Sequence, residues 1–270
     1  MKQPTTIAGA MLTCLCLPAV LHAGVYMEMI ERDAGQSAAR QTVRFWADGP
    51  SLLVEQTDGA RRHAQILRDQ QIYIIDHVKK TYMHLDRKQL EAMGDRLGEM
   101  RKQMEAQLAK LPPEQRQMVE QMMRGKMGAT VDQPKLRIEA SDHRGSAAGA
   151  DCRFWNIWRG ERLDSALCVA SPAKLDGGVE LMQTMKTLAA YFAGMRKAME
   201  RSGFMPPDNG FEQLENIDGL PVINQRYDAL GKLQSEIRTE TIRRETIATS
   251  RFTVPDGYKE ERLPALPAGK

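Results

Sequence analysis

Two hydrophobic periods alternate along this chain and divide it into strand-like and helix-like stretches. Over residues 25–85, apolar and polar side chains alternate in short runs, and turn residues such as Asp48-Gly49-Pro50 and Asp58-Gly59 separate the runs. A period of two is typical of β-strands that bury one face. The pattern therefore predicts a six-stranded antiparallel meander.

Two later stretches have the spacing of three and four residues that indicates amphipathic helices. The first covers residues 86–127, opens with the capping-box pair Asp86 and Gln89, and is interrupted at Pro112-Pro113. The second starts at Ser171-Pro172 and carries its apolar stripe over residues 181–205. We expect both stripes to face one apolar interior, through Met93, Leu97, Met100 and Met104 of the first helix and Met185, Leu188, Phe192 and Met195 of the second.

Further strand-like segments lie between and after the two helices. They cover residues 135–140, 144–149, 152–158, 162–168, 221–227, 233–241 and 245–254, and the tail after Tyr258 is expected to be frayed. The whole pattern predicts an α+β fold, in which a curved antiparallel sheet of about 11–13 strands buries one face under the helices. Because no long linker divides the chain, residues 24–270 are predicted to form one domain.

The N-terminal residues 1–23 have the layout of a secretory signal peptide. A basic residue, Lys2, precedes an apolar run that ends near the small residue Ala23. We expect cleavage between Ala23 and Gly24 and a periplasmic mature protein. A membrane anchor is the alternative, but the run is short for a span of about 20 residues and contains Pro18. No later segment is apolar enough to cross a membrane, so the mature chain is not expected to span one.

Only two cysteines, Cys152 and Cys168, follow the leader, and they flank a hairpin turn at Gly160. Thiols in an oxidising compartment are expected to pair. Symmetric pairing about Gly160 places the two cysteines opposite one another, which predicts a structural disulfide. The same register sets Trp158 opposite Arg162, with the geometry of a cation–π contact.

Composition and motifs argue against several classes of function. The net charge is +3 and the Lys and Arg residues are dispersed, so no nucleic-acid partner is expected. The nucleophile-elbow, phosphate-loop, dinucleotide and zinc-protease motifs are absent from the sequence. The histidines have no metal-ligand spacing. We therefore expect no catalytic residues, no bound metal and no cofactor.

Several short segments carry a resemblance to a known family. They are Ile-Tyr-Ile-Ile-Asp at 72–76, Lys-Thr-Tyr-Met at 80–83, Gly-Leu-Pro-Val at 219–222 and Phe-Thr-Val-Pro-Asp-Gly-Tyr at 252–258. With the leader, they resemble the LolA-like superfamily, and within it secreted bacterial proteins of unknown function that have methionine-rich helices. The resemblance implies an unclosed half-barrel over residues 24–270 with helices on its concave side. It also implies an apolar cavity that accepts acyl chains.

Methionines are concentrated in the helical stretches, with seven of seventeen at residues 90–127 and five at 181–205. Methionine suits an irregular core, an adaptable apolar binding surface or a Cu(I) site. Leucine and phenylalanine share the same stripes, which favours an apolar role. We expect a non-catalytic periplasmic binding protein for lipid or lipoprotein acyl groups. An envelope structural or protein-interaction module with a packed core is the alternative, and methionine-based Cu(I) binding is a further one.

Overall fold

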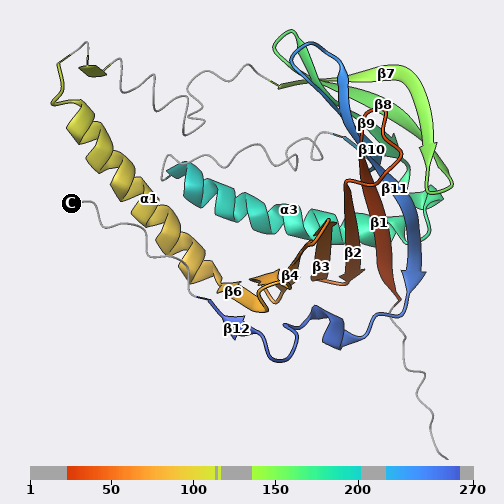
Figure 1. The fold of residues 1–270 in the computed structure, drawn as a ribbon, viewed down its shortest axis with the longest axis horizontal. Coiled ribbons are helices and arrows are strands. Elements are labelled where there is room, and N and C mark those ends of the chain that lie inside the picture. The colour runs from red at the N-terminus through yellow and green to blue at the C-terminus, as the bar shows by residue number, and fades with distance from the viewer. Residues whose placement is uncertain (1–22, 113–114, 117–135, 202–216, 262–270) are drawn as a thin grey trace, which may run out of the picture.

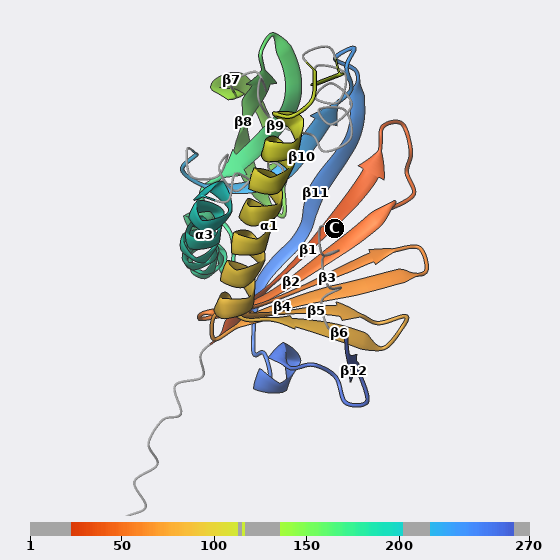
Figure 2. The ribbon, with the colours of Figure 1, turned by 90° about the vertical axis from the view of Figure 1, so that its left-hand side faces the viewer.

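The computed structural model describes residues 23–112, 115–116, 136–201 and 217–261. The strands among these residues form one 12-stranded sheet in the order β12-β6-β5-β4-β3-β2-β1-β11-β10-β9-β8-β7. The sheet curves around two helices and does not close, because β7 and β12 lie at opposite ends of the order (Figures 1 and 2). The fold is therefore the predicted α+β half-barrel. Residues 1–22, which contain most of the expected leader, lie outside the described residues.

The strands have the following bounds: β1 (Gly24–Asp33), β2 (Gln41–Asp48), β3 (Ser51–Asp58), β4 (Arg61–Arg68), β5 (Gln71–Asp76), β6 (Thr81–Leu85), β7 (Leu136–Ala147), β8 (Ala150–Arg159), β9 (Arg162–Ala170), β10 (Leu220–Tyr227), β11 (Leu233–Glu245) and β12 (Lys259–Glu260). The helices are α1 (Arg87–Leu108) and α3 (Gly178–Arg201), with 3₁₀ turns η1 (Pro172–Lys174) and η2 (Thr249–Phe252). Strands β1 to β6 form the predicted meander of antiparallel neighbours.

The C-terminal part of the sheet corrects three sequence predictions. The two strands expected within residues 135–149 are one long strand, β7, with a register shift between Ala140 and Arg144 instead of a break. Residues 245–254 do not form a separate strand, since β11 continues to Glu245 and η2 follows it. The tail after Tyr258 is not frayed at its start, because β12 pairs with β6. This pair is parallel, so the sheet is mixed at one end.

Helix α1 begins at the predicted capping box. The Asp86 amide donates to Gln89 Oε1 at 2.9 Å, and the Gln89 amide donates to Asp86 Oδ1 at 2.7 Å. This reciprocal pair satisfies two backbone donors that helix formation leaves without partners. At the other end, the Arg116 side chain donates to the carbonyl oxygens of Leu108 and Ala109. The predicted helical residues 117–127 lie outside the described residues.

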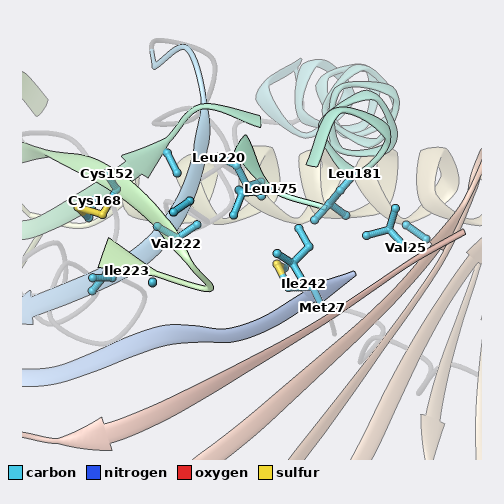
Figure 3. Close-up of a cluster of buried hydrophobic side chains, with 14 of the residues drawn as sticks. Val25, Met27, Cys152, Cys168, Leu175, Leu181, Leu220, Val222, Ile223 and Ile242 are labelled. Atoms are coloured by element: carbon cyan, nitrogen blue, oxygen red, sulfur yellow. A yellow bond between two sulfur atoms is a disulfide. The ribbon is translucent and has the colours of Figure 1, made fainter. Parts of the chain in front are cut away.

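Helix α3 packs on the inner face of the sheet, which we define as the face that it contacts. It lies against β1 and β2, and α1 packs against it on the same side of the sheet (Figures 1 and 2). Leu181 of the helix is fully buried beside Val25, Met27 and Ile242 (Figure 3). Leu220, Val222 and the disulfide continue this cluster toward β8 and β9. We call the whole cluster the inner core.

The outer face of the meander is buried too. Its apolar cluster contains Tyr26, Trp46, Leu53, Ala64, Ile66 and Ile75, and the residues that cover it from the C-terminal segment are Ile247 and Phe252. This segment runs from the end of β11 past the ends of β1–β6 to β12 (Figure 1). We call residues 246–261 the C-terminal strap. Because the strands of the meander carry apolar side chains on both faces, each face has to be covered by another part of the chain.

The predicted disulfide joins Cys152 and Cys168, whose Cα atoms are 5.3 Å apart. The register differs from the predicted one by two residues, since Cys152 faces Ala170 and Cys168 faces Phe154. A two-residue turn and a bulge between Ile157 and Trp158 cause this shift. The predicted contact of Trp158 with Arg162 is therefore wrong, and the guanidinium of Arg137 lies over the Trp158 ring instead, 5.3 Å from its centroid.

We expect replacement of both cysteines by alanine to lower the free energy of unfolding by about 3 kcal/mol, because the crosslink closes a loop that spans 16 residues. Urea titration with and without a reductant measures this. The reductant should destabilise the wild-type chain and leave the double variant unchanged, and an equal response of the two chains would contradict the prediction.

Phe252→Ala should lower the free energy of unfolding by about 3–5 kcal/mol, because Phe252 is 3 % exposed in the outer cluster and a cavity would replace it. Val78→Ala is the matched control, since Val78 is 64 % exposed on the β5–β6 turn and should change stability by about 0.5 kcal/mol or less. Similar losses for the two variants would show that the strap does not cover a core.

Candidate functional site

The pairing of β2 to β6 aligns two rows of apolar side chains across the inner face. Opposed positions form a first row of Ala47, Leu52, Leu67, Ile72 and Leu85, and a second row of Phe45, Val54, Gln65, Ile74 and Met83. Met27 and Val25 of β1 extend these rows to the strand beneath α3. We call the two rows from β2 to β6 the concave band.

The two rows differ in exposure. In the first row, Ala47, Leu52 and Leu85 are buried, and Leu67 and Ile72 are half-buried. In the second row, Phe45, Val54, Ile74 and Met83 are only half-buried, and Gln65 is exposed. Phe45 and Val54 touch the margin of the inner core. The second row therefore presents apolar surface that is incompletely covered by the described residues.

The next row ends the apolar character of this face. It consists of Val43, Gln56, His63, Asp76 and Thr81 at successive opposed positions. Four of these five side chains are polar or charged, whereas Gln65 is the one polar side chain in the concave band. The sheet thus offers a bounded apolar strip with water-compatible side chains along one margin.

The structure tests only part of the site predicted from the helices. Leu188 is 2 % exposed in the inner core, and Met185 is half-buried and packs against that core. The backbones of Met93, Leu97, Met100 and Met104 belong to α1, and those of Phe192 and Met195 belong to α3. Their side chains lie outside the described residues, so their contribution to a site stays a prediction.

Sequence reasoning did not identify the residues of the concave band as a site. The alternation of apolar and polar residues predicts each strand, but the rows depend on which residue of each strand lies opposite which residue of the next strand. The tight turns between these strands are the feature of the sequence that indicates the register. Strands β2 to β5 have six to eight residues each and are joined by two-residue turns at Gly49, Gly59 and Asp69-Gln70. Turns this short fix the register of these four strands.

Specific contacts hold α3 in place beside the band. The Thr184 hydroxyl donates to the Gly49 carbonyl of the β2–β3 turn at 3.0 Å. Gly177 precedes the helix at φ +80°, and a Cβ atom there would lie 2.7 Å from Val25 Cγ2. A side chain at this position would push the helix away from β1. The first turns of α3 are therefore held against β1 and the β2–β3 turn.

An ion-pair cluster connects the start of α3 to β11. Arg244 donates from Nη1 to Asp176 Oδ1 and from Nη2 to Glu180 Oε1, both at 2.7 Å. The hydrogen bond from Arg244 holds the pKa of the Glu180 carboxyl below its ordinary value. Because the cluster is solvent-exposed, its contribution to stability is small. Its main effect is to orient the start of α3 relative to β11.

The described residues offer no other strong chemical centre. Within them, no three His, Cys, Asp or Glu side chains gather as a metal site would require. In the same part of the chain, the helices are all too short or too polar to cross a bilayer. The Cu(I) hypothesis concerns methionine pairs whose side chains lie outside the described residues.

Comparison with known proteins gives similarities at the level of solved structures. No family model and no curated protein matches the chain. An uncharacterized conserved protein from Thermus thermophilus is 8 % identical, with 90 % of this chain and 92 % of that chain covered and a TM-score of 0.44.

Two structures of MucB with MucA are also similar. The Pseudomonas aeruginosa MucA/MucB complex gives 11 % identity over 86 % of this chain, and MucB in complex with periplasmic MucA gives 10 % over 88 %, both with a TM-score of 0.35. The chain spans 56 % and 57 % of the length of those two chains.

Arg244→Met should raise the pKa of Glu180 toward its ordinary value, because the donor that favours the carboxylate is lost. The wild-type pair adds stability above the ordinary pKa of about 4.3, and this gain disappears as the pH falls through the lowered pKa. NMR titration of the Glu180 carboxyl measures the change. Arg243→Met, which removes the neighbouring arginine bonded to Glu245, should leave the pKa of Glu180 unchanged.

Proposed function

We propose that this protein is a non-catalytic binding protein of the bacterial envelope, and that it holds an acyl chain of a lipid or lipoprotein along the concave band. The observation that carries the proposal is the half-buried second row, where Phe45, Val54, Ile74 and Met83 stand on four strands of one sheet face. Apolar side chains left partly open on a concave surface are typical of a ligand-binding face.

The length of the band agrees with this ligand. Neighbouring strands lie about 4.8 Å apart, so the four intervals from β2 to β6 give the band a length of about 19 Å. One acyl chain crosses half of a hydrocarbon core of about 30 Å, which is about 15 Å. An extended chain can therefore lie across the strands along most of the second row.

The chemistry of the band also agrees with an acyl chain. Each CH₂ group that leaves water contributes about 0.8 kcal/mol, so an acyl chain gains affinity even on a partly open surface. The polar row with Gln56, His63 and Asp76 lies along one margin, where it can remain in contact with water or with a polar headgroup. No reacting group is needed for such binding.

Two further features support a location in the envelope. The disulfide between Cys152 and Cys168 requires an oxidising compartment to persist. The N-terminal sequence has the layout of a leader peptide. The short segments that resemble the LolA-like superfamily, together with the half-barrel, support the same class of binding protein. The methionine stripes of α1 and α3 are the proposed cover of the bound chain.

Ile74→Asp should weaken binding of a fluorescent fatty acid by about tenfold or more, because a charge in the second row faces the proposed acyl chain. Val78→Asp places the same charge on an exposed valine of the next turn and should leave the affinity unchanged. Fluorescence titration gives both affinities, and circular dichroism checks that both variants fold.

Native mass spectrometry of the wild-type protein is the companion measurement, with a bound lipid as the expected result. A wild-type chain that neither retains a lipid nor binds the fatty acid would refute the proposed function. Equal losses in Ile74→Asp and Val78→Asp would refute the assignment of the site to the concave band.

A further inference from the structure

The C-terminal strap is fastened to the sheet at two places. Its near anchor is Phe252, which is buried in the outer cluster and whose carbonyl accepts a hydrogen bond from Arg68 Nη1 at 3.3 Å. Beside it, the guanidinium of Arg251 lies over the Trp46 ring, 3.9 Å from the centroid. This anchor is apolar and cationic, with no group that changes charge near neutral pH.

The far anchor joins the strap to the edge of the sheet. The amides of Lys259 and Glu261 donate to the carbonyls of Lys80 and Tyr82, at 3.0 and 2.8 Å. Tyr258 adds a side-chain contact, because its hydroxyl lies 2.9 Å from His77 Nδ1. The two rings meet edge to face with centroids 5.8 Å apart. Because β12 has only two residues, the far anchor rests on these two backbone bonds, the contact of Tyr258 with His77 and a long hydrogen bond of 3.5 Å from the Tyr82 hydroxyl to Glu260.

His77 is poorly placed to carry a charge while Tyr258 covers it. Its Nε2 atom is buried and has no hydrogen-bond partner among the described residues. Burial lowers the pKa of the His77 imidazole, and the nearby Arg62 cation lowers it further. In the tautomer whose Nδ1–H donates to the Tyr258 hydroxyl, protonation converts the buried Nε2 into an N–H group without an acceptor and also places a charge where burial disfavours it.

The other charged groups near His77 partly offset one another. On β4, His63 disfavours the charged imidazole, as Arg62 does, whereas Glu55 of β3 and Asp76 of β5 favour it. Asp76 is also engaged with its own turn, where it accepts from the amides of Val78 and Lys79. The groups that favour the imidazolium therefore do not compensate for its burial, since the net effect on the pKa of His77 is a decrease.

We propose that the contact between His77 and Tyr258 is a pH-sensitive latch, and that protonation of His77 releases the far end of the C-terminal strap from β6. When Tyr258 moves away, water reaches the imidazole and the released state binds the proton more tightly. By linkage, the closed state is fully favoured above the ordinary histidine pKa of about 6.5 and loses this advantage as the pH falls toward the lowered pKa.

Release of the far end uncovers a backbone edge. The carbonyls of Lys80 and Tyr82 lose their partners, and β6 then presents unpaired groups that an extended segment can pair with. Ile247 and Phe252 remain buried, so the centre of the outer cluster stays covered, and only the margin that Tyr258 packs against is opened with the edge. The latch is thus separate from the concave band and is independent of the proposed acyl ligand.

Amide hydrogen exchange of the full chain at pH 7.5 and pH 5.0, expressed as protection factors, tests the latch. We expect the protection of the Lys259 and Glu261 amides to fall by roughly threefold or more at the lower pH, relative to the Phe45 amide of β2. His77→Gln should abolish this pH dependence. His143→Gln, which changes an exposed histidine on β7 that does not act on His77, should retain it.

A second measurement applies even if the glutamine variant fails to fold. NMR titration should give a higher pKa for His77 in Tyr258→Ala than in the wild-type chain, because the cover of the imidazole is removed. An unchanged pKa of His77, a wild-type strap with pH-independent protection, or the same pH dependence in His77→Gln would each overturn the proposal.

Discussion

Burial of both faces of a strongly curved sheet is the constraint on which this structure depends. Strands β1 to β6 carry apolar side chains inward, toward Leu181 of α3, and outward, toward Phe252 of the C-terminal strap. A sheet with helices on one side alone would leave Trp46 and Ile66 in water. The chain solves this by sending one segment across each face, so that α3 packs on β1 and β2 from the inner side and the strap packs on β3, β4 and β6 from the outer side.

The elements that the sequence predicted well depend on local interactions. The meander follows from alternation and tight turns, and the start of α1 follows from the reciprocal pair of Asp86 and Gln89. The pairing of Cys152 with Cys168 was predicted because two cysteines in one hairpin have few alternatives. These features are determined within about twenty residues of chain.

The elements that the sequence did not predict depend on distant contacts. The strap finds its partners in strands about 200 positions earlier, as Phe252 does with Trp46. The two-residue shift of the cysteine hairpin has instead a local cause, the two-residue turn and the bulge at Ile157, that alternation does not reveal. The candidate site was sought in the methionine stripes, where Met185 and Leu188 prove to pack on the core. Its sheet side, with Phe45 and Ile74, becomes visible only when the register aligns the strands.

The position of the strap about 200 residues after the strands that it covers affects the order in which the protein can fold. The strands that it covers precede it in the chain, and their outer apolar cluster, including Trp46 and Ile75, stays open until Ile247 and Phe252 dock. Until then the meander has one open apolar face and an unpaired β6 edge, both of which favour aggregation. Any pathway to the native state therefore has to protect a half-covered sheet until the strap docks, and a chain that lacks Phe252 would lose that cover permanently.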